Sequence, residues 1–415
     1  MRRKCMEELK KRIQEEILEE IDLSIDVRDE EIYGMIDDKL DGYSREHFLS
    51  VKDKIMIRKD IFHRLRGLDV LSQLLSKDSI TEIMINGHEK IFVEENGKIY
   101  RTNLKFESEA RLENVIQQIV AKANRRVNKA SPIVDTRLSD GSRVNVLLSP
   151  ISLDGSILTI RKFAKEGFTM EKLVAMGSID ANVAKRLKIL IESKYNIFIS
   201  GGTGSGKTTF LNALSQFIPK DQRIITIEDS AELRLMQIEN LVRLEVRNAN
   251  IEGENEISMR DLIKSSLRMR PDRIIVGEVR DGAALDMIAA MATGHDGSLS
   301  TGHANSASDM LKRLETMVLM AVDMPVAAVR QQIASAIDII VHLGRLRDRS
   351  RRVLEVIEIM GVKDQEILTN TLYEFKETGA ENGKIKGYLE KKNELKNRKK
   401  LQMAGRVEEY EEDIG

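Results

Sequence analysis

The sequence predicts an α/β protein in which a helix-flanked parallel sheet follows a smaller α+β domain and an N-terminal helical segment. Three observations support this prediction. The chain has 415 residues, which is too long for one ordinary core and suggests two or three domains. Its second half alternates helix and strand patterns, as parallel sheets require. A glycine-rich loop joins one of those strands to a helix, which is typical of a phosphate-binding loop.

Residues 1–65 have the pattern of charged amphipathic helices. Leu9, Ile13 and Ile17 recur at helical spacing, with Glu and Lys between them. We expect these helices to pack on their own domain, and docking to a partner is the alternative.

Residues 66–163 are expected to form the α+β domain. Asn86-Gly87 and Asn96-Gly97 each stand between short apolar segments, and Asn-Gly at such positions is typical of hairpin turns. One helical pattern and two more strand patterns follow. In chain order these are ARLENVIQQIVAKANRRV, SRVNVLLSPIS and ILTIRKF.

A connector, residues 164–180, leads into the predicted parallel-sheet domain, residues 181–375. Helix and strand patterns alternate there in the order ANVAKRLKILIESK, YNIFIS, TTFLNALSQFI, RIITIED, RDLIKSSLRM and RIIVGE. Residues 376–415 are rich in charge and poor in aromatic residues, so we expect an exposed helical or disordered tail.

The charge balance disfavours direct contact with nucleic acid. Lys and Arg number 66 and Asp and Glu 67, a formal net charge of -1, whereas proteins that grip nucleic acid usually carry a basic excess. The single cysteine, Cys5, cannot form an intramolecular disulfide, which fits a reducing cytoplasm. The N-terminus lacks the apolar core of a signal peptide, and no apolar run approaches the roughly 20 residues of a membrane span. We therefore expect a cytoplasmic protein that reaches a membrane through partners.

The strongest motif is a phosphate-binding loop, G-x-x-x-x-G-K-T, between a short apolar strand and a helical run. Its glycines allow backbone N–H groups to converge on phosphate oxygens. Lys207 would reach the β- and γ-phosphates, and the Thr208 hydroxyl would bind Mg²⁺. The loop does not spell the G-x-G-x-x-G of dinucleotide sites. The predicted nucleotide-binding residues are Gly201, Gly202, Thr203, Gly204, Ser205, Gly206, Lys207, Thr208 and Thr209.

Two further apolar strand patterns end in acids. In RIIVGEVRD the acid is Glu278, and Gly277 stands where such strands often carry Asp, so binding of Mg²⁺ would fall to Glu278, directly or through water. RIITIEDSAEL ends in Glu228, Asp229 and Glu232. A hydrolase needs a carboxylate that orients and deprotonates the attacking water. Strands often end in solvated acids without a catalytic role, and the phosphate loop is what favours catalysis here.

Two histidines, His295 and His303, lie in TGHDGSLSTGHANS, a segment dense in Gly, Ser and Thr. A zinc site would need more ligands, and no cysteine or further clustered histidine completes a set. We predict that the pair senses phosphate or positions water, and two polar loop residues without function are the alternative.

Arginines stabilise the negative charge that phosphoryl transfer spreads over the γ-phosphate. Arg143 and Arg161, near the end of the α+β domain, would reach the nucleotide if that domain folds over it. Arg125 and Arg126 are weaker candidates. Any one arginine is more often a surface ion-pair partner.

With these segments in place, the chain resembles the type II/type IV secretion ATPase superfamily, and specifically its CpaF-type branch from Flp (tight adherence) pilus systems. The similarity covers residues 66–375 and rests on ITEIMING, ASPIVDTRLSDGSRVNVLLSP, ILTIRKF, ISGGTGSGKTT, TIEDSAELRL, LRMRPDRIIVGEVRDGAALDMIAAMATGHDGSLSTGHANS and RLETMVLM. Ala292 and Gly302 depart from the family pattern, where Asn and a bulkier residue are usual, and leave the details of the histidine segment open.

The resemblance implies a PAS-like α+β domain joined by a linker to a RecA-like P-loop ATPase domain. It implies ATP and Mg²⁺ as cofactors and a homo-oligomer, a hexameric ring. The implied partner is a polytopic inner-membrane platform protein, with pilin or secreted protein as indirect cargo.

The resemblance also implies roles for single residues. Glu232 matches the general base of the family's acidic box, and Glu278 matches the glutamate that serves the metal. His295 and His303 match the two positions of the family's histidine box. Arg143 and Arg161 match the two arginines that close over phosphate.

Three hypotheses result. The first is an ATP-hydrolysing motor, peripheral at the cytoplasmic face of the membrane, whose arginines close on the γ-phosphate and open after hydrolysis. The second is a motor of the same fold in another secretion line, such as conjugative DNA transfer or type II export. The third is a non-catalytic, ATP-gated ring scaffold, against which the intact acids argue.

Overall fold

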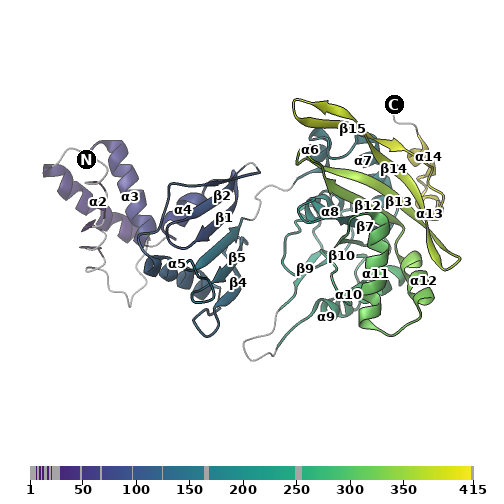
Figure 1. Ribbon diagram of the computed structural model, residues 1–415, viewed down its shortest axis with the longest axis horizontal. Coiled ribbons are helices and arrows are strands. Elements are labelled where there is room, and N and C mark those ends of the chain that lie inside the picture. The colour runs from purple at the N-terminus through teal and green to yellow at the C-terminus, as the bar shows by residue number, and fades with distance from the viewer. Residues whose placement is uncertain are drawn as a thin grey trace. The chain divides into compact units, whose positions relative to one another are not determined.

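The computed structural model divides into two compact units, residues 1–165 and 166–415, which are described separately (Figure 1). The residues described are 6, 9, 10, 12, 13, 16, 17, 20, 29–46, 49–65, 68–95, 97–123, 125–162, 168–247 and 255–412. Cys5, Asn96 and residues 163–167 lie outside these ranges.

The first unit begins with helices that share one core. Helices α2 (Asp29–Glu46) and α3 (Val51–Leu65) share this core with Ile13 and Ile17, which are themselves helical. The buried core residues are Leu9, Ile13, Ile17, Ile32, Ile36, Leu40, Ile57 and Ile61. The apolar faces of the described helices are therefore buried against one another, as their spacing predicted.

The rest of the first unit is a six-stranded antiparallel sheet with the order β3-β2-β1-β6-β5-β4. Its strands are β1 (Ile80–Asn86), β2 (Ile91–Glu95), β3 (Lys98–Arg101), β4 (Ile133–Arg137), β5 (Arg143–Leu147) and β6 (Ile157–Arg161). Helices α4 (Val70–Leu75) and α5 (Glu109–Lys122) pack on the sheet through apolar residues such as Leu71 and Val115. The predicted α+β pattern is present.

The second unit is built on a nine-stranded sheet with the order β15-β14-β13-β12-β7-β11-β10-β8-β9. The six strands from β12 to β9 are parallel, and β13, β14 and β15 extend the sheet in antiparallel fashion. The strands are β7 (Ile197–Gly201), β8 (Ile224–Glu228), β9 (Leu241–Glu245), β10 (Arg273–Val276), β11 (Leu299–His303), β12 (Ile339–Arg345), β13 (Arg351–Lys363), β14 (Glu366–Glu381) and β15 (Lys384–Lys391).

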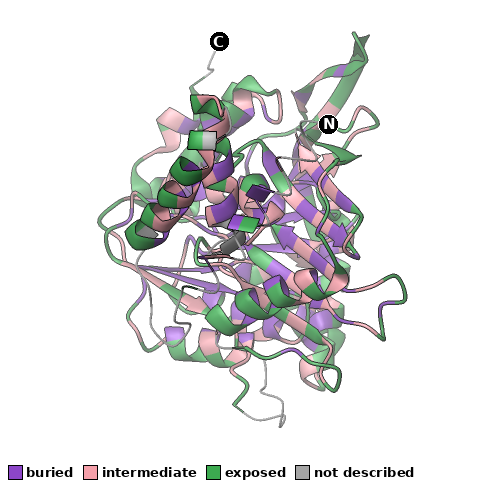
Figure 2. Ribbon diagram, turned by 90° about the vertical axis from the view of Figure 1, so that its left-hand side faces the viewer, coloured by how far each residue is buried: buried purple, intermediate pink, exposed green. Residues whose placement is uncertain are grey.

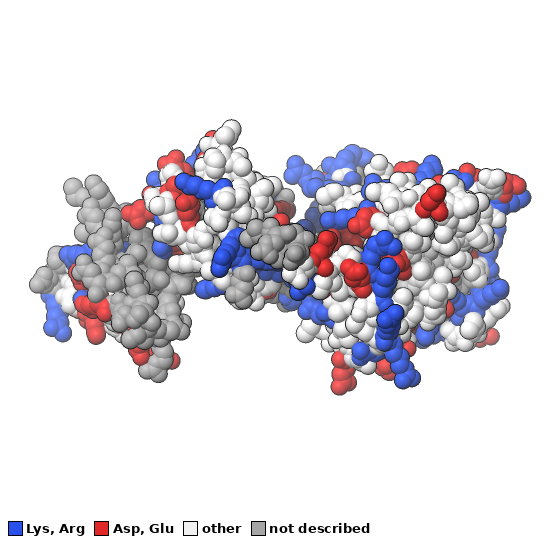
Figure 3. All heavy atoms as spheres, turned by 90° about the horizontal axis from the view of Figure 1, so that it is seen from below, with Lys and Arg blue, Asp and Glu red and all other residues white. Residues whose placement is uncertain are grey.

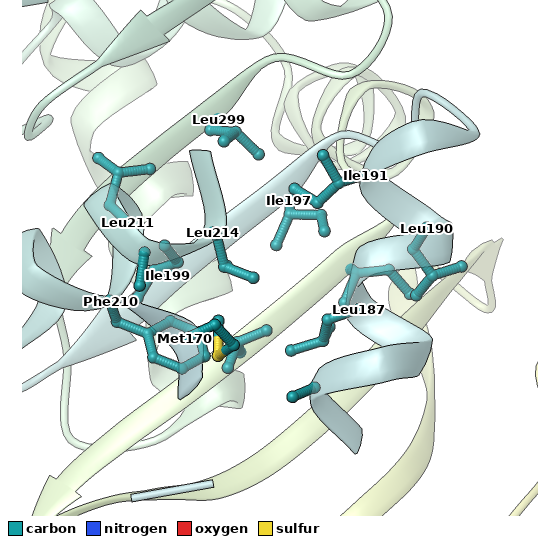
Figure 4. Close-up of a cluster of buried hydrophobic side chains, with 14 of the residues drawn as sticks. Met170, Leu187, Leu190, Ile191, Ile197, Ile199, Phe210, Leu211, Leu214 and Leu299 are labelled. Atoms are coloured by element: carbon teal, nitrogen blue, oxygen red, sulfur yellow. The ribbon is translucent and has the colours of Figure 1, made fainter. Parts of the chain in front are cut away.

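Helices cover both faces of this sheet. The helices are α6 (Met170–Ala175), α7 (Ala181–Glu192), α8 (Lys207–Ser215), α9 (Met259–Ser266), α10 (Ala283–Ala292), α11 (Ala307–Ala321), α12 (Val326–Ala336), α13 (Lys399–Ala404) and α14 (Val407–Glu411). One apolar core joins α6, α7 and α8 to the sheet (Figure 4). A second core joins α9, α10, α11 and α12 to the sheet. The strands between these cores are largely buried (Figure 2). This is the predicted helix-flanked parallel sheet.

Two boundaries differ from the sequence expectation. The expected connector, residues 164–180, contains α6, whose Met170 and Leu173 belong to the core of the second unit. The expected tail, residues 376–415, instead contains the last six residues of β14, all of β15 and the helices α13 and α14, with Leu401 and Tyr410 buried. The charged residues that suggested a tail belong to edge strands, where one or both faces meet solvent.

Candidate functional site

The phosphate-binding loop connects β7 to α8, as its motif predicted. Gly201 pairs with His303 of β11 on one side and with Leu343 of β12 on the other. A Cβ at Gly201 would lie 2.4 Å from the Leu343 carbonyl oxygen, so this position requires glycine. The loop therefore starts at the carboxyl edge of the sheet, the edge where ligands bind in open α/β folds.

Lys207 folds back over this loop. Its Nζ donates to the carbonyl oxygens of Gly201 (3.1 Å) and Gly202 (3.2 Å) and to His303 Nδ1 (3.2 Å). Burial lowers the pKa of Lys207, and the nearby Glu278 carboxylate opposes that change. The amino group is thus held where a phosphate would meet the loop.

Glu278 and His303 meet beside Lys207. Glu278 Oε1 lies 2.9 Å from His303 Nε2. Because Nδ1 accepts from Lys207, Nε2 carries the proton that faces the carboxylate. Burial, followed by the charge of Lys207, lowers the pKa of His303. The imidazole is therefore neutral near pH 7 and lies between the lysine and the carboxylate.

Arg280 completes this charged group, and the sequence motifs did not single it out. Its Nη2 donates to Glu278 Oε2 at 2.9 Å, and its Nη1 lies 3.5 Å from Asp229 Oδ2. Burial opposes ionisation of Glu278, but the hydrogen bond and charge of Arg280 outweigh it, so the pKa of Glu278 is lowered. The only available signal was its place two residues after the predicted acid.

Glu228 is buried at the start of the acidic segment. Its Oε2 accepts the backbone N–H groups of Glu232 (2.7 Å) and Leu233 (2.9 Å). Burial raises the pKa of Glu228 to about 7, against the effect of those two hydrogen bonds. A Cβ on Gly277 would lie 2.9 Å from Glu228 Cγ. Glu228 therefore occupies the space that the expected Asp side chain would need.

The hydrogen bond to Glu228 fixes the backbone of Glu232. The Glu232 carboxylate contributes to the negative electrostatic potential at Arg280. Glu232 is partly exposed, as are Thr208 and Thr209 in the first turn of α8. The charge of the predicted general base thus acts on the same arginine as the charges of Asp229 and Glu278.

The residues present fit a magnesium ion bound together with nucleotide. Among the side chains that the structure describes, Glu278 Oε1 is a buried carboxylate oxygen that accepts no hydrogen bond of normal geometry, although His303 Nε2 is close. No group of three or more His, Cys, Asp or Glu side chains in the described ranges is arranged as a metal site. The Thr208 hydroxyl and the Glu278 carboxylate suit Mg²⁺, because this ion is usually bound by only one or two protein ligands. Its other ligands are oxygens of phosphate and water.

His295 lies at the opposite edge of the sheet. It precedes β11, whereas His303 ends it, and the four residue steps of that strand span about 13 Å. His295 Nδ1 lies 3.3 Å from the Ala290 carbonyl oxygen, and the adjacent Asp296 is bonded to Lys400 of α13 at 2.7 Å. The structure therefore brings His303, but not His295, to Lys207.

The predicted arginines belong to the first unit. Arg143 of β5 and Arg161 of β6 are exposed and are cross-strand partners. Glu82 of β1 pairs with Arg161 on its other side. The two arginines thus form one basic site on the sheet of that unit. Arg125 and Arg126 follow α5 and lie outside that pair.

A cavity of about 480 Å³ opens beside Thr203 of the phosphate loop. It is lined by Thr203, His303, Ala304, Asn305, Asp309, Lys312, Arg313 and Thr316.

Within the described part of the chain, no helix is both long and apolar enough to cross a membrane. Lys, Arg, Asp and Glu are intermixed over the face shown in Figure 3.

Comparison with known proteins identifies the family of the chain. Residues 65–399 match the type II/IV secretion system protein family. The chain is 35% identical over 306 residues to the conjugal transfer protein TrbB of Rhizobium radiobacter, covering 72% of this chain and 90% of that one. It is 31% identical over 316 residues to the type IV secretion system protein PtlH of Bordetella pertussis, covering 70% and 93%.

Solved structures support the fold alone. The ATPase DotB of Legionella pneumophila is similar with a TM-score of 0.51 at 21% identity, covering 69% of this chain and 79% of that one. The pilus retraction motor PilT with bound ADP gives 0.50 at 18% identity, covering 82% and 88%. These neighbours confirm the predicted α/β, RecA-like architecture. The chain belongs to the type II/IV secretion ATPase family.

Proposed function

We propose that this protein is an ATP-hydrolysing motor for secretion or for assembly of a type IV-like pilus. The observation that carries the proposal is the contact of Lys207, His303 and Glu278 at the carboxyl edge of the parallel sheet. A cation on the phosphate loop, a neutral imidazole and an ionised carboxylate are the groups that a γ-phosphate and its attacking water require.

Each side chain has a part in this proposal. Lys207 exchanges its loop carbonyls for phosphate oxygens, and Glu232 takes the proton of the attacking water. His303 holds the γ-phosphate side of the site, next to the cavity at Thr203. Thr208 and Glu278 would hold Mg²⁺, which would supply positive charge against the charge that develops on the phosphates.

The same proposal includes assembly and location. A homo-hexamer would act at the cytoplasmic face of the membrane on a polytopic platform protein, and pilin or secreted protein would be moved indirectly. Arg143 and Arg161 would close over the γ-phosphate, and hydrolysis would release them. The sequence segments that resemble the CpaF-type branch support an Flp pilus system.

A second pathway is favoured by the relatives. Their names refer to conjugal transfer and to type IV secretion, which supports a motor of a type IV secretion line. The formal charge of -1, together with the intermixed charges on the face shown in Figure 3, argues against a direct DNA track. Adjacent genes for a platform protein and small pilins would favour the pilus line, and salt-dependent DNA binding would favour conjugation.

The hydrolytic proposal is tested by Glu232→Gln. We expect the variant to bind Mg-ATP within about threefold of the wild type while phosphate release falls at least about 100-fold, because a general base typically contributes 10² to 10⁴. Calorimetry measures the binding, and a phosphate-release assay measures turnover. Glu239→Gln, an exposed acid of the same segment, is the matched control. Normal hydrolysis by Glu232→Gln would falsify the general-base assignment, and a wild type that fails to bind Mg-ATP would overturn the whole proposal.

A further inference from the structure

An arginine from a distant hairpin lies on the phosphate loop. Arg351, the first residue of β13, donates from Nε to the Gly204 carbonyl oxygen at 2.9 Å. Its Cδ is 3.4 Å from the place that a Cβ on Gly206 would occupy. The side chain therefore lies along the outer side of the loop, because the inner side presents N–H groups to phosphate.

The position of this arginine is set by the order of the strands. β10, which Glu278 follows by two residues, and β11, which ends at His303, lie on one side of β7, and β12 and β13 lie on the other. The γ-phosphate has to face the carboxylate and the imidazole. The nucleoside of a bound nucleotide therefore leaves the loop on the side of β12 and β13, where Arg351 stands.

The guanidinium group has bonding capacity left for a ligand. Arginine carries five N–H donors, and the contact with Gly204 uses the one on Nε. The side chain is exposed, and no acceptor from the described residues is recorded for its two terminal nitrogens. A guanidinium in this position can donate to ribose hydroxyls and can stack on a purine ring.

We propose that Arg351 binds the nucleoside part of the nucleotide. The contact with Gly204 holds the guanidinium at the edge of the loop, and its free N–H groups and flat face receive the ribose and base. Arg351 thus makes the site select a nucleoside triphosphate over a bare chain of phosphates. This inference rests on the proposed ATP site and adds the residue that distinguishes the nucleoside.

The test compares two ligands on the full chain, Mg-ADP and Mg-tripolyphosphate, by calorimetry. Arg351→Met keeps the aliphatic stem and removes the guanidinium. We expect its Kd for ADP to rise about tenfold, equivalent to about 1.4 kcal/mol, while its Kd for tripolyphosphate changes less than about twofold. Arg351→Lys, which keeps the charge without the planar donor set, should also lose most of the ADP affinity. Arg349→Met, an exposed arginine of the same hairpin, should change neither.

Turnover gives a second readout that does not depend on tripolyphosphate. A lost nucleoside contact should raise KM for ATP about tenfold and lower kcat less than about twofold. If Arg351 only supports the loop, both ligands weaken together and kcat falls with the misplaced γ-phosphate. That result, or unchanged ADP binding, overturns the inference. A wild-type protein without Mg-ADP binding would instead overturn the ATP site itself.

Discussion

Glu228 shows at the residue scale how the acidic segment is built. It is 3% exposed, and its carboxylate fixes the backbone at Glu232 and Leu233. An acid in this position costs free energy when it is ionised, and the pKa of about 7 records that cost. The residue serves as an anchor from which Glu232 extends, while Glu278 and Asp229 meet the cation of Arg280.

This anchor gives a pH dependence with a definite sign. Because the folded pKa of Glu228 is above its ordinary value of 4.5, its contribution to stability is complete below about pH 4.5 and is lost as pH rises through about 7. The free energy of unfolding should fall over that range by on the order of 3 kcal/mol. In Glu228→Gln the amide oxygen can accept the same two N–H groups, so the variant should lose this slope.

The measurement is the midpoint of thermal unfolding for both proteins between about pH 5 and 8, followed by calorimetry. Glu239→Gln serves as the control because its side chain is exposed. An unchanged slope in Glu228→Gln would mean that another group titrates.

The sequence was sufficient for the residues that belong to local motifs. The phosphate loop and Glu278 each lie at the end of a strand pattern, His303 belongs to a short Gly-rich motif, and the structure places them together. Arg280 and Arg351 carry no local signal, since an arginine gains meaning only from the residues that the fold brings to it. His295 was placed with His303 because a Gly-rich segment does not reveal that a whole strand separates its two ends.

At the element scale, the C-terminal hairpin and helices are integral to the second unit. Lys400 of α13 bonds Asp338, which precedes β12, and Asp296, which precedes β11, each at 2.7 Å. Tyr195, just before β7, donates to the Asn397 carbonyl oxygen at 2.6 Å. The end of the chain thus ties together the starts of three parallel strands.

Lys400→Met tests this tie. Burial raises the pKa of Asp338, and Lys400 opposes that rise, so removing the cation leaves a mostly buried acid without its cationic partner, although the Asn196 N–H still donates to it. We expect a loss of about 2 kcal/mol in the free energy of unfolding, measured by urea titration. Lys399→Met, one residue away and exposed, should change stability by less than about 0.5 kcal/mol. Equal stability of the two variants would contradict the role of the tie.

The wrong prediction of a C-terminal tail has a physical explanation. β14 and β15 carry Lys and Glu at many positions, as in the cross-strand pair Lys376 and Glu390. Charged residues on edge strands prevent pairing with other chains, and they remove the alternation by which strands are recognised. Composition alone therefore could not separate this hairpin from a solvated helix.

At the scale of the whole molecule, the two units carry different parts of the proposed chemistry. The phosphate loop and acids belong to residues 166–415, and the paired arginines belong to residues 1–165. Arg143→Met and Arg161→Met should therefore separate binding from turnover. We expect each to keep Mg-ADP affinity within about threefold and to lower phosphate release at least about 30-fold, because charge stabilisation acts mainly in the transition state.

Phosphate-release assays on the full chain, with calorimetry for ADP, provide the comparison. Arg125→Met is the control, since Arg125 follows α5 and is not part of the pair. Full activity of both arginine variants would show that the first unit does not supply charge to the reaction.

The folded-back position of Lys207 has a consequence for the departure of products. If the chain turns over ATP as proposed, the ammonium group can return to Gly201, Gly202 and His303 as ADP leaves, because these three residues already offer it acceptors. These internal acceptors would lower the cost of separating the lysine from phosphate. The proposed motor would therefore release spent nucleotide easily, a property that suits a machine that has to start again.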